Sequence, residues 1–159
     1  MIAASPIFTI SSAEEFRQKA LEVFRHQAAA NPVYREFIRL LRIEPARIDC
    51  LEAIPFLPIS FFKTHRVITE NQEEEIVFTS SGTTGSAASR HLVADLGIYR
   101  ESFRKGFEYF YGNAREYRIL ALLPGYLERS GSSLVLMVDE LIKLSGHPES
   151  GFFLHDHER

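Results

Sequence analysis

Strand-type and helix-type segments alternate along the second half of this 159-residue sequence. Residues 75–79 and 90–93 are β-branched, aromatic or apolar enough to predict strands. Residues 95–112 carry apolar side chains at three- and four-residue steps, so they predict a helix that Asp95 caps and Gly112 ends. A central strand is expected over 117–123 and a second helix over 132–146. This alternation predicts an α/β fold, with parallel strands as the expected arrangement.

Two helices are expected before this alternating part. Ser12 and Glu15 have the spacing of a capping box, and the apolar pattern that follows predicts a helix to about Ala30. Asn31 then stops that helix and caps the next one, in which Pro32 takes the first helical position. The fold class is therefore α/β, with N-terminal helices followed by alternating strands and helices.

Three prolines interrupt the apolar and aromatic stretch between Pro45 and Thr64. Proline removes a backbone donor and restricts the preceding residue, so this stretch cannot continue as a helix. We expect residues 54–62 to be extended and buried.

Composition fits one folded domain over residues 1–159, with 45% hydrophobic and 25% charged residues. The net charge is −3 and the basic residues are scattered, so nucleic acid is not expected as a partner. Cys50 is the single cysteine, which excludes an intrachain disulfide framework, favours a cytoplasmic location and is typical of a small buried filler. No leader and no membrane-length apolar run is visible, so no membrane association is expected.

A hydroxyl-rich run follows the predicted strand 75–79. Six of its eight residues carry hydroxyls and the other two are glycines, from Thr79 to Ser86. Glycine lets the backbone turn successive N–H groups toward an anion, and the hydroxyls add adjustable donors, so this run suits a polyphosphate. It is not the P-loop of kinases, because Gly82 and Gly85 enclose only two residues and no lysine follows. The alternative is a flexible Ser/Gly surface linker.

Residues 78–85, Phe-Thr-Ser-Ser-Gly-Thr-Thr-Gly, resemble the phosphate loop of the adenylate-forming superfamily, which includes acyl-CoA synthetases, phenylacetate-CoA ligases and peptide-synthetase adenylation domains. The flanking residues 55–63, 123–126 and 151–152 are most similar to the LuxE-type acyl-protein synthetases. The similarity extends from about Asn31 onward. It implies that residues 1–159 are the N-terminal part of a truncated adenylate-forming domain.

The resemblance implies a two-step reaction. A small carboxylic acid, most naturally a fatty acid, attacks the α-phosphate of ATP with Mg²⁺, and the acyl group then passes to a thiol of a protein cysteine or of coenzyme A. The ATP phosphates would be held by residues of the run and one arginine, namely Thr79, Ser80, Ser81, Gly82, Thr83, Thr84, Gly85 and Arg90. Catalytic residues and the ligands of adenine, ribose and magnesium are expected beyond Arg159. We therefore expect this chain alone to be inactive and prone to associate, with a homo-oligomer left open.

Several residues have two interpretations. The superfamily lysine that often follows the loop has no counterpart here, so Arg90 either supplies the missing charge or is a solvated arginine at a strand end. Tyr126 and His91 lie either in the vicinity of the substrate or in ordinary packing and local hydrogen bonds. His155–Glu158 has metal-ligand side chains, but a solvated terminal segment is the preferred interpretation, so no metal site is assigned.

A second function of a different class fits the same residues. A non-catalytic α/β module could bind a phosphorylated ligand or a protein partner without adenylation. The downstream sequence decides between the two, because adenylation needs the later elements of the superfamily.

Overall fold

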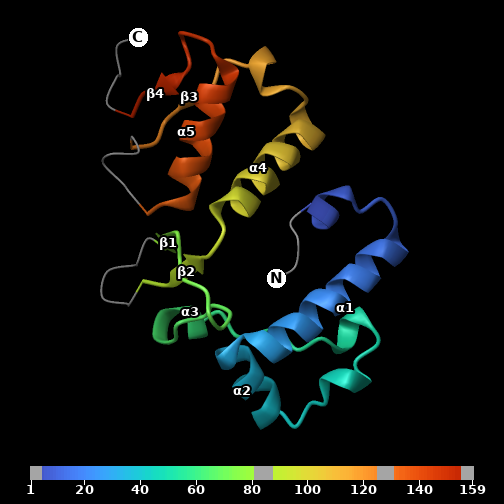
Figure 1. Cartoon of the computed structure of the whole chain (residues 1–159). Coiled ribbons are helices and arrows are strands. Elements are labelled where there is room, and N and C mark those ends of the chain that lie inside the picture. The colour runs from blue at the N-terminus through green and yellow to red at the C-terminus, as the bar shows by residue number, and fades with distance from the viewer. Residues whose placement is uncertain (1–4, 81–87, 125–130, 155–159) are drawn as a thin grey trace. The chain divides into compact units, whose positions relative to one another are not determined.

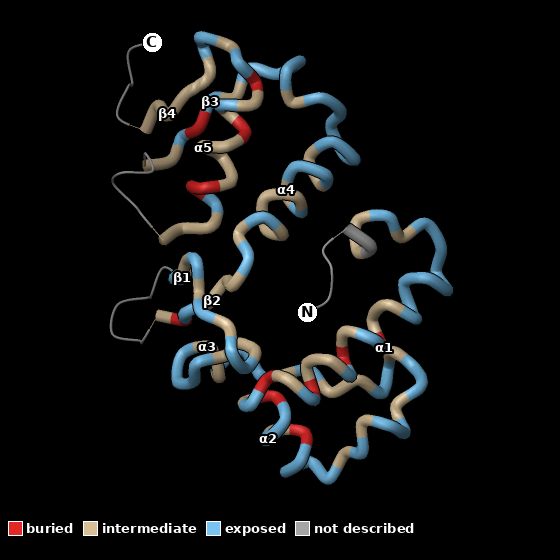
Figure 2. Tube along the Cα trace, in the orientation of Figure 1, coloured by how far each residue is buried: buried red, intermediate tan, exposed pale blue. Residues whose placement is uncertain are grey.

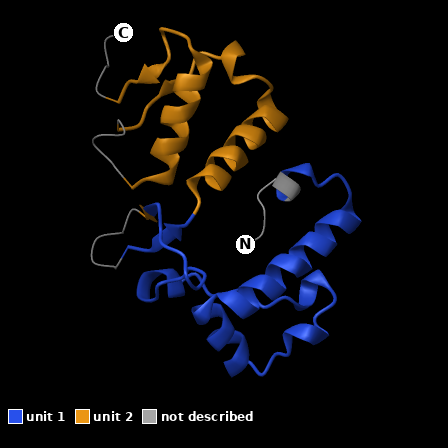
Figure 3. Ribbon diagram, viewed as in Figure 1, with its two compact units in different colours: residues 1–77, 81–94 blue, residues 78–80, 95–159 orange. Residues whose placement is uncertain are grey.

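The computed structural model describes residues 5–80, 88–124 and 131–154, and the chain divides into two compact units (Figure 3). The first unit comprises Met1–Val77 and Ser81–Ala94, and the second comprises Phe78–Ser80 and Asp95–Arg159. N-terminal helices precede strands and further helices (Figure 1), so the α/β prediction is confirmed.

The first unit opens with a short 3₁₀ helix, η1 (Ser5–Thr9), and the long helix α1 (Ala13–Ala30). Ser12 Oγ accepts the Glu15 amide at 3.2 Å, which confirms the predicted cap. The Glu15 carboxylate in turn accepts the amide of Ser11 at 2.8 Å, one residue earlier than a capping box requires. Local side-chain chemistry therefore determines where α1 begins.

Asn31 joins α1 to the next helix, α2 (Pro32–Leu40). Its backbone N–H donates to Gln27 O at 2.9 Å and closes α1. Its side-chain oxygen accepts the Tyr34 amide at 3.2 Å and caps α2, as predicted. Asn31 is buried, so the junction belongs to the core of the first unit.

That core lies between α1 and α2 (Figure 2), where buried residues face one another: Phe24, Ala28, Tyr34 and Ile38. The Phe24 and Tyr34 rings meet edge to face with centroids 6.2 Å apart, and Tyr34 Oη donates to Pro55 O at 2.5 Å. Burial raises the pKa of Tyr34. The tyrosine therefore connects α2 to the proline-containing segment.

The segment after α2 departs from its prediction. It contains two 3₁₀ turns, η2 (Pro45–Arg47) and η3 (Leu51–Ala53), and the one-turn helix α3 (Phe61–Thr64). Residues 54–58 lack regular structure, but Phe56 is 84% exposed and Ile59 is 70% exposed, so the prediction of a buried segment was wrong. Ile54 and Leu57 pack against the core, whereas Phe56 between them is largely exposed.

Cys50 is also exposed, which corrects its interpretation as a buried filler. It occupies the N-cap position of η3, where the chain turns at the surface.

Strands β1 (Ile76–Thr79) and β2 (Arg90–Val93) form a two-stranded sheet and lie where the sequence predicts them. Glu75 N donates to Val93 O at 2.9 Å beside this sheet. Phe78 is the buried residue of β1.

The second unit contains α4 (Leu96–Tyr111), η4 (Ala114–Glu116), α5 (Ser133–Ser145) and a pair of short strands. These strands, β3 (Leu120–Ala121) and β4 (Gly151–Phe152), pair in parallel with α5 between them in the sequence. The expected parallel arrangement is thus found here.

The predicted central strand over 117–123 is wrong in extent. The ladder includes only Leu120 and Ala121 of that range among the described residues, and Leu120 and Leu122 are 63% and 74% exposed. Ala121 is buried, since it points to the opposite face from its two neighbours. An apolar run predicts a buried strand only if other elements cover both faces, and that depends on tertiary structure.

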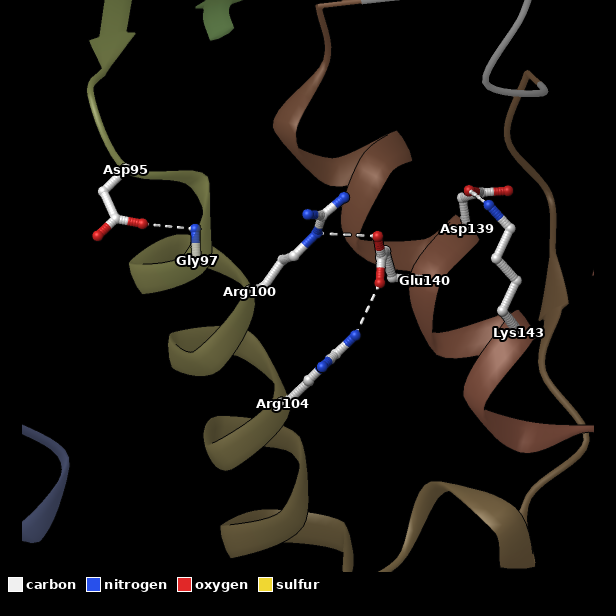
Figure 4. A network of polar contacts seen from close by, with 7 residues as sticks. All are labelled: Asp95, Gly97, Arg100, Arg104, Asp139, Glu140 and Lys143. Atoms are coloured by element: carbon white, nitrogen blue, oxygen red, sulfur yellow. Dashed lines mark hydrogen bonds and ion pairs between the residues drawn. The ribbon is translucent and has the colours of Figure 1, made fainter. Parts of the chain in front are cut away.

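Capping and ion pairs fix the two helices of this unit (Figure 4). Asp95 Oδ1 accepts the Gly97 amide at 2.8 Å, which confirms the predicted start of α4. Glu140 of α5 accepts Arg100 Nε at 3.0 Å and an Arg104 guanidinium nitrogen at 2.9 Å. One carboxylate therefore binds two successive turns of α4.

Candidate functional site

The hydroxyl-rich run connects β1 to β2. Its first two residues, Thr79 and Ser80, are described and exposed. Ser81, Gly82, Thr83, Thr84 and Gly85 lie outside the described residues, as do Tyr126 and His155–Glu158. Phosphate binding by the run stays a prediction, and its flanking residues can be examined directly.

The incoming flank is held firmly within the second unit. Phe78 is 6% exposed and its ring centroid lies 4.9 Å from that of Tyr99, whose hydroxyl donates to Ser133 O at 2.8 Å. Burial raises the pKa of Tyr99, which keeps its hydroxyl protonated as a donor. The Thr79 amide donates to Gly131 O at 2.9 Å. The run therefore departs from a fixed strand end.

The start of α5 lies beside this strand end. Ser132 caps the helix by accepting the Val135 amide at 3.4 Å, and the preceding residue, Gly131, holds Thr79. The N-terminus of a helix carries a partial positive charge that favours anions. The second unit thus places the first residue of the run near a region of favourable potential for phosphate.

The outgoing flank belongs to the first unit. Ser89 is 6% exposed, and its Oγ lies 3.3 Å from His91 Nε2 in a hydrogen bond. The His91 ring stacks on Phe62 with centroids 4.6 Å apart and planes inclined by 21°. The local-hydrogen-bond interpretation of His91 is therefore confirmed, while its place near a substrate is still a prediction.

Arg90 is exposed at the start of β2, where a solvated strand-end arginine would lie. The neighbouring Arg66 guanidinium donates two hydrogen bonds to Glu74, at 2.9 and 2.5 Å. These bonds, chiefly, lower the pKa of Glu74 to about 2, and the charge of Arg90 contributes in the same direction. A phosphate role for Arg90 stays a prediction.

The first unit also contains a cavity of about 650 Å³ that the sequence did not reveal. We call it the α1 groove. Its walls come from η1 and the residue that follows it, one face of α1, the start of α2, η3 and residues 54–67. The lining residues are Ile7, Ile10, Phe16, Lys19, Ala20, Val23, Phe24, Gln27, Asn31, Tyr34, Leu51, Ile54, Pro55, Phe56, Leu57, Phe62 and Val67. Three separate stretches of chain build it, so no local pattern could predict it. The available signal was the row of apolar residues on α1, of which Phe16 is 53% exposed.

The described residues show neither a metal-ligand cluster nor a membrane-spanning helix. Within the described ranges, no three His, Cys, Asp or Glu side chains gather as metal ligands. Among the helices of those ranges, none has both the length and the apolar character needed to cross a bilayer.

Comparisons with known proteins agree with the LuxE-type resemblance. The chain is 38% identical over 74 residues to the long-chain-fatty-acid–luciferin-component ligase of Photorhabdus luminescens, an alignment that covers 45% of this chain and 63% of the relative. The alignment thus spans just under two thirds of that relative. No solved structure matches the chain. Residues 2–124 match the family described as acyl-protein synthetase, LuxE, and since this range is most of the sequence, the chain belongs to the LuxE acyl-protein synthetase family.

Proposed function

We propose that this chain supplies the phosphate-binding part of an ATP-dependent ligase that activates a fatty acid as an acyl-adenylate and transfers the acyl group to a thiol. One observation carries the proposal: the hydroxyl- and glycine-rich run, Thr79–Gly85, begins at the end of strand β1, directly after the buried Phe78, inside the range that matches the family. The fatty acid is proposed because the relative from Photorhabdus luminescens is a long-chain-fatty-acid ligase.

The run would act as a clamp on the β- and γ-phosphates of ATP. Attack of a carboxylate on the α-phosphate requires positioning and charge stabilisation more than a protein nucleophile, so hydroxyls and backbone amides suffice for this role. The fixed strand end at Thr79 and the nearby start of α5 support it, because a clamp works best when its attachment is rigid. Arg90 would add the positive charge that the superfamily lysine supplies elsewhere.

The remaining chemistry would come from other parts of the protein. Mg²⁺ would neutralise negative charge on the phosphates of ATP, and its protein ligands, the adenine and ribose contacts and the catalytic residues would be residues other than those assigned above. The acyl acceptor would be a protein cysteine or coenzyme A. This assignment to the adenylate-forming superfamily is part of the proposal.

The test uses the complete protein, expressed from the longest natural reading frame that contains these residues. Ser81→Ala and Thr83→Ala should each lower carboxylate-dependent pyrophosphate release by about ten-fold or more, because each removes a phosphate donor. Ser86→Ala is the matched control, since it deletes a hydroxyl just outside the residues assigned to the phosphates. Wild-type rates of pyrophosphate release in both loop variants would refute the clamp. If the complete wild-type protein releases no pyrophosphate with any acid of a broad panel, the non-catalytic module is favoured.

A further inference from the structure

The α1 groove extends along α1 over a length that suits an aliphatic chain. Its lining follows one face of α1 from Phe16 to the C-cap Asn31, which is about 22 Å at 1.5 Å per residue. The hydrocarbon core of a bilayer, two acyl chains thick, measures ~30 Å, so one long chain needs about 15 Å. The cavity of about 650 Å³ is also of the size, roughly 300–1,000 Å³, that small-molecule sites occupy.

The two ends of the groove differ in polarity. Apolar residues line the end at the start of α1, including Ile7, Ile10 and Phe16. Polar side chains line the other end, where Asn31 Nδ2 donates to Gln27 Oε1 at 3.2 Å. An amphiphile would therefore place its tail near η1 and its head toward Asn31.

Lys19 does not change this orientation. It is the one charged side chain among the described lining residues, but its ammonium group pairs with Glu22, which is not part of the lining. Its charge is therefore balanced by a carboxylate outside the lining, and its methylene stem can cover apolar surface, as long basic side chains commonly do.

One residue of the groove lining contacts strand β2, which follows the hydroxyl-rich run. Phe62 lines the groove and stacks on His91. His91 follows Arg90, the first residue of β2, and all of these residues lie within the first unit.

We propose that the α1 groove holds the aliphatic tail of the acyl substrate, with its methyl end near Ile7 and Ile10 and its carboxylate end toward Asn31. The inference rests on the proposed function for the identity of the acid. It assigns η1, α1, the start of α2, η3 and residues 54–67 to the selection of the acid by chain length.

Binding to this 159-residue chain can be measured without ATP. Titration calorimetry with hexanoate, decanoate and tetradecanoate, below micelle-forming concentrations, should show the affinity rising by about three- to four-fold per added methylene until the groove is filled. Ala20→Trp places a large ring halfway between Phe16 and Phe24 on the lining face, so it should weaken tetradecanoate about ten-fold or more and hexanoate less than about two-fold. Ala29→Trp is the matched control on the exposed face of the same helix and should leave both affinities unchanged.

A second variant covers the case in which Ala20→Trp fails to fold, as judged by its far-ultraviolet circular dichroism. Phe16 is more than half exposed, so Phe16→Ala should fold and should still weaken tetradecanoate by about three- to ten-fold, because it removes part of the wall.

The outcomes separate this inference from the proposed function. Suppose that affinity rises with chain length and that Ala20→Trp weakens only the longer acids, while the complete protein releases no pyrophosphate. This result would support the groove and refute the ligase. Pyrophosphate release whose chain-length profile is the same in wild type and Ala20→Trp would refute the groove and leave the ligase intact. Absence of tetradecanoate binding would also overturn the inference. So would a dimer, detected by sedimentation, that Ala20→Trp disrupts and that prevents the acid from binding.

Discussion

Asn31→Ala tests whether the junction between α1 and α2 depends on one buried side chain. The backbone of Asn31 is extended, with φ of −101° and ψ of 110°, a conformation that alanine adopts without strain. Its N–H bond to Gln27 O would also survive the change. The variant therefore removes the side-chain bonds and little else.

The expected cost follows from those bonds. Loss of an asparagine N-cap typically costs about 0.5–2 kcal/mol. The amide bond to Gln27 adds about 0.5–1.5 kcal/mol, and the Tyr34 N–H is left in a buried place where water cannot replace the partner. We expect Asn31→Ala to lower the free energy of unfolding by about 2 kcal/mol.

Ser12→Ala is the matched comparison, because it removes the cap of α1 at an exposed site where water can bond to the freed amide. Its cost should be about 0.5–1 kcal/mol. A difference of 1 kcal/mol between the variants corresponds to a shift in Tm of roughly 4–8 °C for a unit of this size. Asn31→Ser keeps an oxygen acceptor and should recover part of the loss.

Urea unfolding followed by far-ultraviolet circular dichroism measures these differences. The slope with urea should be unchanged if only the native state is affected. If Asn31→Ala and Ser12→Ala destabilise the protein equally, the burial of the junction does not contribute as argued. A Ser variant no better than Ala would show that the cap oxygen is unimportant.

Two further predictions concern ion pairs. Arg66→Ala should raise the pKa of Glu74 from about 2 toward its ordinary value, which NMR titration would measure. Because the pKa is lowered in the folded state, the stability that this pair contributes is present above the ordinary pKa and is lost as pH falls from about 4.5 to about 2. The stability of the variant should therefore depend less on pH in that window. Glu140→Gln should lower the free energy of unfolding, measured with urea, by about 0.5–1.5 kcal/mol, because its mostly buried carboxylate binds two half-exposed arginines. Asp139→Asn, which removes the charge from a single ion pair with an exposed lysine, should lower it by less than about 0.5 kcal/mol. Equal losses of stability in the two variants would contradict this ranking.

Helix boundaries were predictable because local chemistry determines them. Ser12, Asn31, Asp95 and Ser132 each accept a backbone amide at the start of a helix, and Gly146 ends α5 in the left-handed conformation at φ 66°. A side chain that satisfies an amide two or three residues away needs no distant partner. The sequence therefore contained all the information that these boundaries require.

Burial was less predictable because it depends on what covers a segment. Phe56 and Leu122 lie in apolar runs that predicted buried segments, yet both are largely exposed, while Leu57 and Ala121 next to them are covered. The residue types determine how hydrophobic each run is. Which of its side chains are covered depends on segments that lie far away in the sequence and pack against the run. The α1 groove is the extreme case, since its walls come from three such segments.

The proposed functional residues divide into two groups that rest on different kinds of evidence. The run Thr79–Gly85 was predicted from sequence because phosphate recognition uses backbone amides and hydroxyls of consecutive residues. Recognition of an aliphatic chain uses apolar area without a required order along the chain, so any arrangement of apolar residues on several elements can provide it. The proposed phosphate clamp is accordingly predicted from seven consecutive residues, whereas the candidate site for the acyl tail required η1, α1, η3 and residues 54–67 to be placed together in space.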